Sequence, residues 1–261
     1  MKSDPATRSP VTDPTQPDPP DGFHYTAMAR SGNSFFIAYQ DLLHATLRFA
    51  SSSDGGVNWV CLTLDNSNKS DGDSPAIILD GTNIYISYVG QTGQGATAYD
   101  SIYMMVSPDA GVTWKKRTVA AKAYATGYYT SVAATGAQVF VSYFNARDRK
   151  LKLAKSGNYG SSWVMTTVDS NSNVGRYSSL LLAPGVMYLS YSDWNNSSLK
   201  VATSNNGGRT WTKKTVVADD NLGCPSAAAV LITDLYLLYF NYTPTQAGMT
   251  GVMLTKIANQ H

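Results

Sequence analysis

The chain has 261 residues, of which 43% are hydrophobic and 15% are charged, and its formal net charge is +2. This length can bury a substantial core and suits one all-β domain. The weak net charge and the absence of a long basic run argue against nucleic acid as a partner. No apolar stretch approaches the length of about 18 residues that indicates a membrane span.

All 18 acidic residues are Asp, because the sequence contains no Glu. Asp and Asn favour turns and Glu favours helices, so this bias indicates strands, many turns and almost no helix. The two cysteines, Cys61 and Cys224, are expected to be free and mostly buried thiols. The three His residues have no metal-binding spacing, and we expect no metal or cofactor.

The N-terminal residues 1–21 are rich in Pro and Asp, which is typical of an extended lead-in. They do not have the basic and then apolar pattern of a signal peptide. Low charge and abundant Ser, Thr and Asn nevertheless favour an extracellular or cell-surface location. Either a signal was removed from the chain or the protein leaves the cell by another route.

Five repeated segments follow this lead-in, and they begin at Gly22, Gly72, Gly127, Gly175 and Gly223. Each start is followed by an apolar run that ends in Tyr, then by a third strand, and in four units by a fourth strand that opens with Trp. Four short strands per unit predict the blade of a β-propeller. We therefore predict a single five-bladed propeller of four-stranded antiparallel blades over residues 22–261.

A Ser-x-Asp/Asn-x-Gly-x-x-Trp turn precedes the fourth strand in the first four units. Its Asp or Asn can accept backbone N–H groups, its Gly can adopt positive φ, and its Trp can pack between neighbouring blades. The pattern resembles the Asp box, or BNR repeat, of sialidase-like β-propellers, which implies a structural role for these turns. The Asp or Asn and the Trp of the four turns are Asp54 and Trp59, Asp109 and Trp114, Asn158 and Trp163, and Asn206 and Trp211.

The fifth unit ends at His261, where its own Asp box and fourth strand would begin. Residues 6–13 resemble the fourth strands that precede the other Gly starts. We therefore expect residues 6–13 to supply the missing outer strand and to close the ring. The alternative is an unstructured tail.

One face of the predicted propeller carries the loops between blades and the loops between second and third strands. Aromatic rings beside Asp, Asn and Arg suit the recognition of sugars, because rings stack on C–H patches and planar polar groups bind hydroxyls. The alternative is that these polar residues only cap strand ends. The candidate ligand-binding residues on this face are Tyr25, Asp41, His44, Tyr129, Asn145, Arg147, Arg176, Tyr177, Asp193, Trp194 and Asn241.

The second unit is longer than the others. Its Tyr-to-Trp spacing is 26 residues, from Tyr88 to Trp114, against 20 in the first, third and fourth units. The extra residues fall within 90–101, on the candidate face. Long loops often carry function, although a neutral insertion has the same appearance in the sequence.

Catalytic residues of the sialidases are not evident in the sequence. The family resemblance implies an Arg-Ile-Pro motif and a Tyr nucleophile activated by Glu, and the chain has neither the motif nor any Glu. Five-bladed glycosidases also generally use paired carboxylates with Glu as the acid. Asp41 and Asp193 are the pair that spacing alone suggests.

These observations lead us to expect no catalytic residues and a non-catalytic recognition module that binds a glycan or a protein through the loop face. One alternative is a structural or assembly subunit that packs against copies of itself or another chain. A second alternative is a glycoside hydrolase with an atypical site made of Asp residues. The fold alone does not select among them.

Overall fold

The computed structural model describes residues 23–67, 70–92, 99–121, 129–218, 227–231, 234–241 and 251–257. These residues form 19 strands in five antiparallel sheets, together with one short 3-10 helix, η2 (Trp194–Asn196). The all-β prediction is therefore confirmed. The ranges that contain residues 1–21 and Cys224 lie outside the described residues.

Four sheets have four strands, and the last sheet has three within the described residues. The first sheet contains β1 (Phe23–Ser31), β2 (Ser34–Asp41), β3 (Thr46–Ser52) and β4 (Val60–Asp65). The second contains β5 (Ser70–Asp80), β6 (Asn83–Thr92), β7 (Tyr99–Ser107) and β8 (Lys115–Ala120). The third contains β9 (Ser131–Thr135), β10 (Gln138–Asn145), β11 (Lys150–Ser156) and β12 (Val164–Asp169). The fourth contains β13 (Val174–Ala183), β14 (Val186–Asp193), β15 (Ser198–Ser204) and β16 (Thr212–Ala218), and the fifth β17 (Ala227–Leu231), β18 (Asp234–Asn241) and β19 (Gly251–Ile257).

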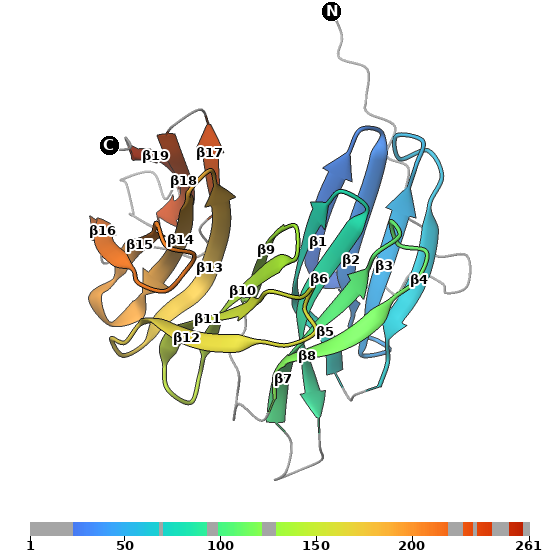
Figure 1. The fold of residues 1–261 in the computed structure, drawn as a ribbon, viewed down its shortest axis with the longest axis horizontal. Helices are drawn as coiled ribbons and strands as arrows, with labels where there is room; N and C mark the ends of the chain where they lie inside the picture. The colour runs from blue at the N-terminus through green and yellow to red at the C-terminus, as the bar shows by residue number, and fades with distance from the viewer. Residues whose placement is uncertain are drawn as a thin grey trace, which may run out of the picture.

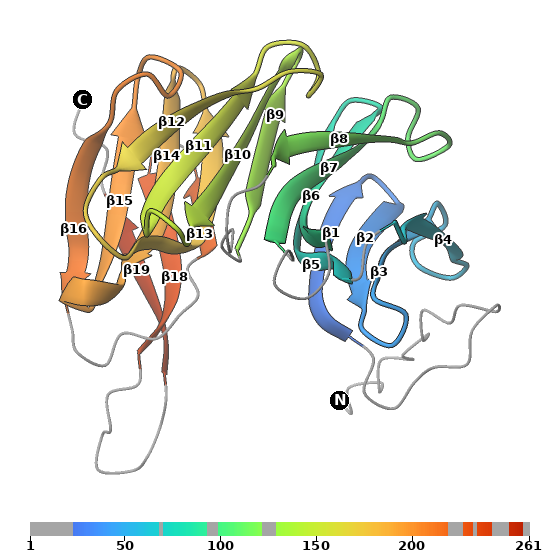
Figure 2. The same cartoon turned by 90° about the horizontal axis from the view of Figure 1, so that it is seen from below.

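Each sheet is a simple meander in which neighbours in sequence are neighbours in space. The first strands of successive sheets pack against each other, β1 against β5, β5 against β9, β9 against β13 and β13 against β17. The sheets follow one another in chain order along an arc, with the first and last sheets at opposite ends (Figures 1 and 2). This arrangement is consistent with a β-propeller, but the described residues form an open arc. The predicted closing strand, residues 6–13, lies outside them.

Hydrophobic clusters fill each junction between neighbouring sheets. Between the second and third sheets, for example, Tyr85 and Met104 pack with Val139 and Val141. Between the third and fourth sheets, Phe140 packs in one cluster with Leu189. Burying one such side chain contributes about 1.5–3 kcal/mol, so the junctions hold the sheets in fixed positions.

The glycines that start the second and fourth units fit tightly against the preceding sheet. Gly72 has φ +91°, and a Cβ there would lie 2.9 Å from Cα of Leu47. Gly175 has φ +108°, and a Cβ there would lie 2.8 Å from Cα of Leu151. Close backbone approach and positive φ together require Gly, which explains part of the repeat pattern.

The four Ser-to-Trp turns have the hydrogen bonds that the sequence predicts. In the first turn Asp54 accepts the Ser52 hydroxyl at 2.7 Å and the Asn58 N–H at 2.9 Å. Asp109, Asn158 and Asn206 accept the equivalent backbone N–H groups at 2.8–3.0 Å in the other turns. These bonds close the hairpin between the third and fourth strands of each sheet.

Three of the four turn tryptophans, Trp114, Trp163 and Trp211, pack between neighbouring sheets, as predicted. The ring of Trp114 contacts Phe49 of the first sheet edge-on, with centroids 4.8 Å apart. Trp163 packs on the cluster between the second and third sheets, and Trp211 on the cluster between the third and fourth. Trp59 of the first sheet lies beside Phe35 of its own sheet, with centroids 6.5 Å apart.

Candidate functional site

A pocket of about 270 Å³, which we call the central pocket, lies near the starts of the first strands of four sheets. Its size is near the lower end of the range that holds small ligands, about 300–1,000 Å³. Hydroxyl groups and aromatic rings dominate its walls, which suits a sugar better than an apolar ligand. The lining residues are Tyr25, Thr26, Ser74, Pro75, Tyr129, Thr130, Tyr177 and Ser178.

The backbone turns the same repeat position into this pocket in three sheets. Ser74, Tyr129 and Tyr177 each stand two residues after a Gly start, and their φ values are 48°, 78° and 53°. Left-handed backbone at a residue other than Gly costs about 1–3 kcal/mol, and such residues are found in turns and at functional sites. The ladders of β5 and β13 also shift register beside Ser74 and Tyr177. These irregularities turn the side chains out of the ladder.

Two tyrosines form the central part of the pocket wall. The rings of Tyr129 and Tyr177 have centroids 3.8 Å apart, and the Tyr129 hydroxyl donates to the Tyr177 hydroxyl at 2.9 Å. The Thr130 hydroxyl donates to the Ser74 carbonyl at 2.9 Å, which ties the third sheet to the second. The hydroxyls of Ser142 and Ser178, also 2.9 Å apart, tie the third sheet to the fourth. The pocket is therefore pre-formed by contacts between sheets.

Two carboxyl groups share one face of the second sheet, and one of them adjoins this pocket. Asp73 accepts the hydroxyl of the pocket residue Ser74 at 2.8 Å. In the ladder Asp73 is opposite Val89, which is opposite Ile102, and Asp100 is two residues from Ile102. Because opposite residues and alternate residues share a face, Asp73 and Asp100 lie on the same side. Ile102 packs into the junction with the third sheet, so this side faces that junction.

Asp73 and Asp100 differ from the buried aspartates of the chain in their accessibility, because both are half-buried. Burial raises the pKa of the Asp100 carboxyl, and a hydrogen bond with Gln91 only partly opposes this effect. A carboxyl with a raised pKa retains its proton to higher pH, which is the property that a general acid needs.

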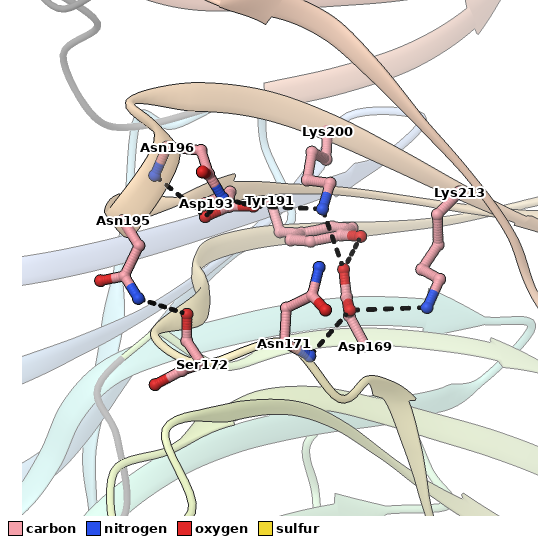
Figure 3. Close-up of polar contacts among 9 residues, drawn as sticks. All are labelled: Asp169, Asn171, Ser172, Tyr191, Asp193, Asn195, Asn196, Lys200 and Lys213. Atoms are coloured by element: carbon pink, nitrogen blue, oxygen red, sulfur yellow. Dashed lines mark hydrogen bonds and ion pairs between the residues drawn. The ribbon is translucent and has the colours of Figure 1, made fainter.

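A different kind of acidic cluster lies between the third and fourth sheets. Figure 3 shows Asp169 between the ammonium groups of Lys200 and Lys213, at 3.3 and 3.5 Å, with the Tyr191 hydroxyl donating to it at 2.7 Å. Burial alone would raise the pKa of Asp169, but these donors, the charges of the two lysines and the Asn171 N–H lower it. Asp169 is fully buried, so this cluster holds two sheets together and offers no reactive carboxyl.

The first and second sheets are joined in the same way. Asp65 at the end of β4 accepts the Tyr88 hydroxyl and pairs with Lys116, both from the second sheet. Burial would raise the pKa of Asp65, and these contacts together lower it. We call the two arrangements, Asp65–Tyr88–Lys116 and Asp169–Tyr191–Lys200–Lys213, the inter-sheet latches.

Three predicted ligand-binding residues cap the turn that follows their strand. Asp41 accepts the His44 N–H at 3.1 Å, and Asn145 accepts the Asp148 N–H at 2.9 Å. Asp193 accepts the Asn196 N–H at 3.3 Å. The capping alternative therefore describes the contacts that these side chains make in the structure.

Asp41 and Asp193 do not make a convincing catalytic pair. Asp193 is buried, and it pairs with Lys200 at 3.1 Å and accepts the Asn196 side-chain amide. The second oxygen of Asp41 contacts Nδ1 of His44 at 2.8 Å. Within the described residues, no hydrogen bond or ion pair joins Asp41 or His44 to Asp193.

The remaining candidates occupy different places on the face. Tyr25, Tyr129 and Tyr177 line the central pocket together. Arg176 and Trp194 lie beside it and contact each other. Arg147 is exposed in the loop after β10. Asn241 ends β18, and its side chain lies outside the described residues.

The sequence interpretation did not select Ser74, Thr130, Ser178 or Asp100. The hydroxyl residues gave no signal, because Ser and Thr are common throughout the strands. Asp100 did have a signal, since it lies within the longer loop region of the second unit. The flanks of that loop are β6, which ends at Thr92, and β7, which begins at Tyr99, and residues 93–98 lie outside the described residues.

Comparison with solved structures supports the β-propeller class. The chain is similar to an α-L-arabinanase from Penicillium chrysogenum complexed with arabinobiose, with a TM-score of 0.63 and 12% identity over 90% of this chain and 82% of the other. It is also similar to a GH43 endo-arabinanase from Bacillus licheniformis, with a TM-score of 0.53 and 14% identity over 90% and 94%. A third similar structure is the Hadza microbial sialidase Hz136, with a TM-score of 0.56 and 14% identity over 79% of this chain and 47% of that one.

No protein-family model matches the sequence. No curated protein matches it either. At these low identities the structural likeness establishes the fold alone.

The expectation of a non-catalytic recognition module is contradicted by this comparison. The similar structures are named as hydrolases of glycans, and they match the chain over most of its length. The absence of Glu does not exclude an enzyme, since a partly buried Asp can also serve as a general acid. The names of the similar structures agree better with the glycoside hydrolase alternative than with a non-catalytic module.

Among the described residues, no group of three or more His, Cys, Asp or Glu side chains is arranged to bind a metal ion. In the same part of the chain, no helix has both the length and the apolar character needed to cross a membrane.

Proposed function

We propose that the protein is a glycoside hydrolase whose substrate binds in the central pocket, with Asp73 and Asp100 as its two catalytic carboxyl groups. The observation that carries the proposal is the pair of half-buried carboxyl groups on one face of the second sheet, one of which, Asp73, accepts the hydroxyl of Ser74 in a pocket lined with hydroxyls and tyrosines. The proposal is also supported by the similarity to enzymes named as arabinanases and a sialidase.

In this proposal Asp100 is the general acid. It donates its proton to the glycosidic oxygen as the bond from that oxygen to the anomeric carbon breaks. A water molecule adds to the anomeric carbon and gives a proton to Asp73, which acts as the general base. The raised pKa of Asp100 suits the first role, and the position of Asp73 next to the pocket residue Ser74 suits the second.

Tyr129 and Tyr177 supply a binding surface. Their rings, in contact and tilted by 39° to each other, offer an aromatic surface to the C–H groups of a sugar, and their hydroxyls can bond to sugar hydroxyls. Their left-handed backbone keeps both rings in place before the ligand arrives. Such preorganisation lowers the entropy cost of binding.

The proposal extends to the architecture. We propose that the ring has five blades in a single domain, that residues 6–13 close it, and that the four Ser-to-Trp turns are Asp boxes of the sialidase-like type. Apolar side chains on the free faces of the end sheets support closure, since Met28 is 63% exposed in β1 and Leu254 is 65% exposed in β19.

The test is hydrolysis of a panel of arabino-, xylo- and galacto-oligosaccharides. Asp73→Asn and Asp100→Asn should each lower kcat at least about 100-fold, because each removes one proton-transfer group. Activity of the unmodified protein should fall as pH rises through the pKa of Asp100, because the acid then loses its proton. The stereochemistry of the released sugar, followed by NMR, should show inversion if a water molecule attacks directly.

Asp148→Asn is the matched control, because Asp148 is exposed on the same face and its carboxylate pairs, among the described residues, with Lys152. It should retain normal activity. Turnover that survives both the Asp73 and Asp100 substitutions would contradict the assignment of the two carboxyls. No turnover on any glycoside by the correctly folded protein would contradict the proposed function.

A further inference from the structure

Arg176 occupies an unusual position at the start of β13. Its guanidinium carbon lies 5.0 Å from the ring centroid of Phe144, at the end of β10, and 5.0 Å from that of Trp194, in η2. Arg176 thus bridges the third and fourth sheets beside Tyr177, the next residue, which lines the central pocket. Two cation–π contacts hold the guanidinium in one orientation.

The guanidinium has no polar partner within the described residues. Its Nε is buried without a hydrogen bond, and none of its nitrogens forms an ion pair or a hydrogen bond with the protein. Since its terminal nitrogens are not among the buried unpaired atoms, solvent reaches them. A half-buried guanidinium that lacks polar partners requires an explanation, because burial without compensation is costly.

The surroundings leave this positive charge uncompensated. Asp193, the carboxyl nearest in sequence to the Trp194 contact, is engaged by Lys200 and Asn196. The loop that follows Phe144 adds Arg149, which is exposed, and its one acidic residue, Asp148, pairs with Lys152. This side of the pocket therefore attracts anions.

We propose that Arg176 binds an anionic substituent of the substrate, a carboxylate or a sulfate ester on a sugar whose ring lies on the half-exposed Trp194. Aromatic contacts on the guanidinium leave the terminal N–H groups free in its plane, where they can bind two oxygens of one oxyanion. Trp194 is 50% exposed and offers its surface to the sugar that carries the charge. The inference rests on the proposed function and extends it, because it assigns the substrate to the acidic glycans.

The experiment measures binding by calorimetry with the full chain and three ligands of equal length: an oligouronate, its neutral methyl ester and a sulfated neutral oligosaccharide. The protein should bind at least one acidic ligand about tenfold or more tightly than the methyl ester, with weaker binding at higher salt. The ligand that shows this preference identifies the carboxylate or the sulfate ester as the group recognised.

Arg176→Gln should abolish this preference and leave binding of the methyl ester unchanged. Arg149→Gln is the matched control, because it removes one exposed positive charge from the same face without touching the aromatic pair. It should retain most of the preference. Trp194→Ala should weaken the binding of all three ligands, because it removes the surface on which the sugar lies.

Equal affinity for the acidic ligands and the methyl ester would overturn the inference. It would also be overturned if Arg176→Gln, shown to be folded by its thermal transition, kept the acidic preference. Should Arg176→Gln fail to fold, Arg176→Lys keeps the charge but loses the planar pair of donors, and an unaltered preference in that variant would again contradict the inference.

Binding and turnover separate this inference from the proposed function. Binding of an acidic ligand that depends on Arg176, without cleavage of any glycoside, would support the anion site and contradict the hydrolase. Cleavage of neutral glycosides, with no preference for acidic ligands, would support the hydrolase and contradict the anion site.

Discussion

The junction between the second and third sheets differs from the two junctions beside it. The first–second and third–fourth junctions each have an inter-sheet latch, in which Asp65 or Asp169 accepts a Tyr hydroxyl and pairs with Lys. Asp65 and Asp169 each pair in the ladder with a Leu near the start of the third strand of their sheet. In the second sheet the equivalent position is Ala120, which pairs with Ile102, so the second–third junction has no such carboxylate. Tyr143 replaces Tyr88 and Tyr191 there, and its hydroxyl makes no hydrogen bond within the described residues.

This difference separates stability from function. Where the chain has a latch, its acidic groups are buried and fully paired, and they hold two sheets together. Where the latch is missing, Asp73 and Asp100 are half-buried and lie on the side of the second sheet that faces the junction. The same residue type therefore occurs in two environments in one repeat, and burial distinguishes them.

The largest expected effect comes from removing a latch carboxylate. Asp169→Asn should lower the free energy of unfolding by about 3–5 kcal/mol, because it removes the buried carboxylate that pairs with Lys200 and accepts the hydroxyl of buried Tyr191. Urea denaturation measures the change. Asp148→Asn, which breaks an exposed pair with Lys152, should cost less than about 1 kcal/mol. Similar losses in the two variants would show that burial does not distinguish the pairs.

The tyrosines at the equivalent positions give a sharper test with one chemical change. Tyr191→Phe should cost about 1.5–3 kcal/mol, because the lost hydroxyl donates to a buried carboxylate. Tyr143→Phe should change the free energy of unfolding by less than about 0.5 kcal/mol, because its hydroxyl has no such partner in the described part of the chain. Equal costs, measured by urea denaturation, would remove the proposed contrast between the junctions.

A smaller effect should appear in the pH dependence of stability. The latch contacts lower the pKa values of Asp65 and Asp169 below the ordinary value of 3.8. A lowered folded-state pKa adds stability above the unfolded-state pKa, and this stability is lost as pH falls through the folded-state value. The urea midpoint should therefore decrease as the pH is lowered from 5 into the acid range. The decrease should be smaller in Asp169→Asn than in the unmodified protein. A midpoint with the same acid dependence in both proteins would contradict the assignment.

The fold could be predicted from the sequence because its signals repeat. The Gly starts, the Tyr at the end of each second strand and the Trp turns occur at nearly constant spacing, and each has a local physical cause. The Gly72 and Gly175 positions need close backbone approach, and the turn aspartates need only their own neighbours. Such local requirements can be read from one repeat and checked in the next.

The site could be predicted only in part. Tyr25, Tyr129 and Tyr177 were expected on the candidate face, and all three line the pocket. The pairing of Asp73 with Asp100 depends on ladder register across three strands, with shifts of register beside Asp73, and no sequence pattern gives that alignment. The lack of a partner for Arg176 likewise depends on two aromatic rings from different sheets.

The irregular backbone at Ser74, Tyr129 and Tyr177 has a practical consequence for engineering. Because left-handed backbone aims one position per sheet at the pocket, the specificity of the candidate site can be redesigned at residues 74, 129 and 177 while the blades stay intact. Asn and Asp tolerate left-handed backbone better than β-branched residues do, so a small library of polar replacements at these positions should fold and sample new ligand preferences.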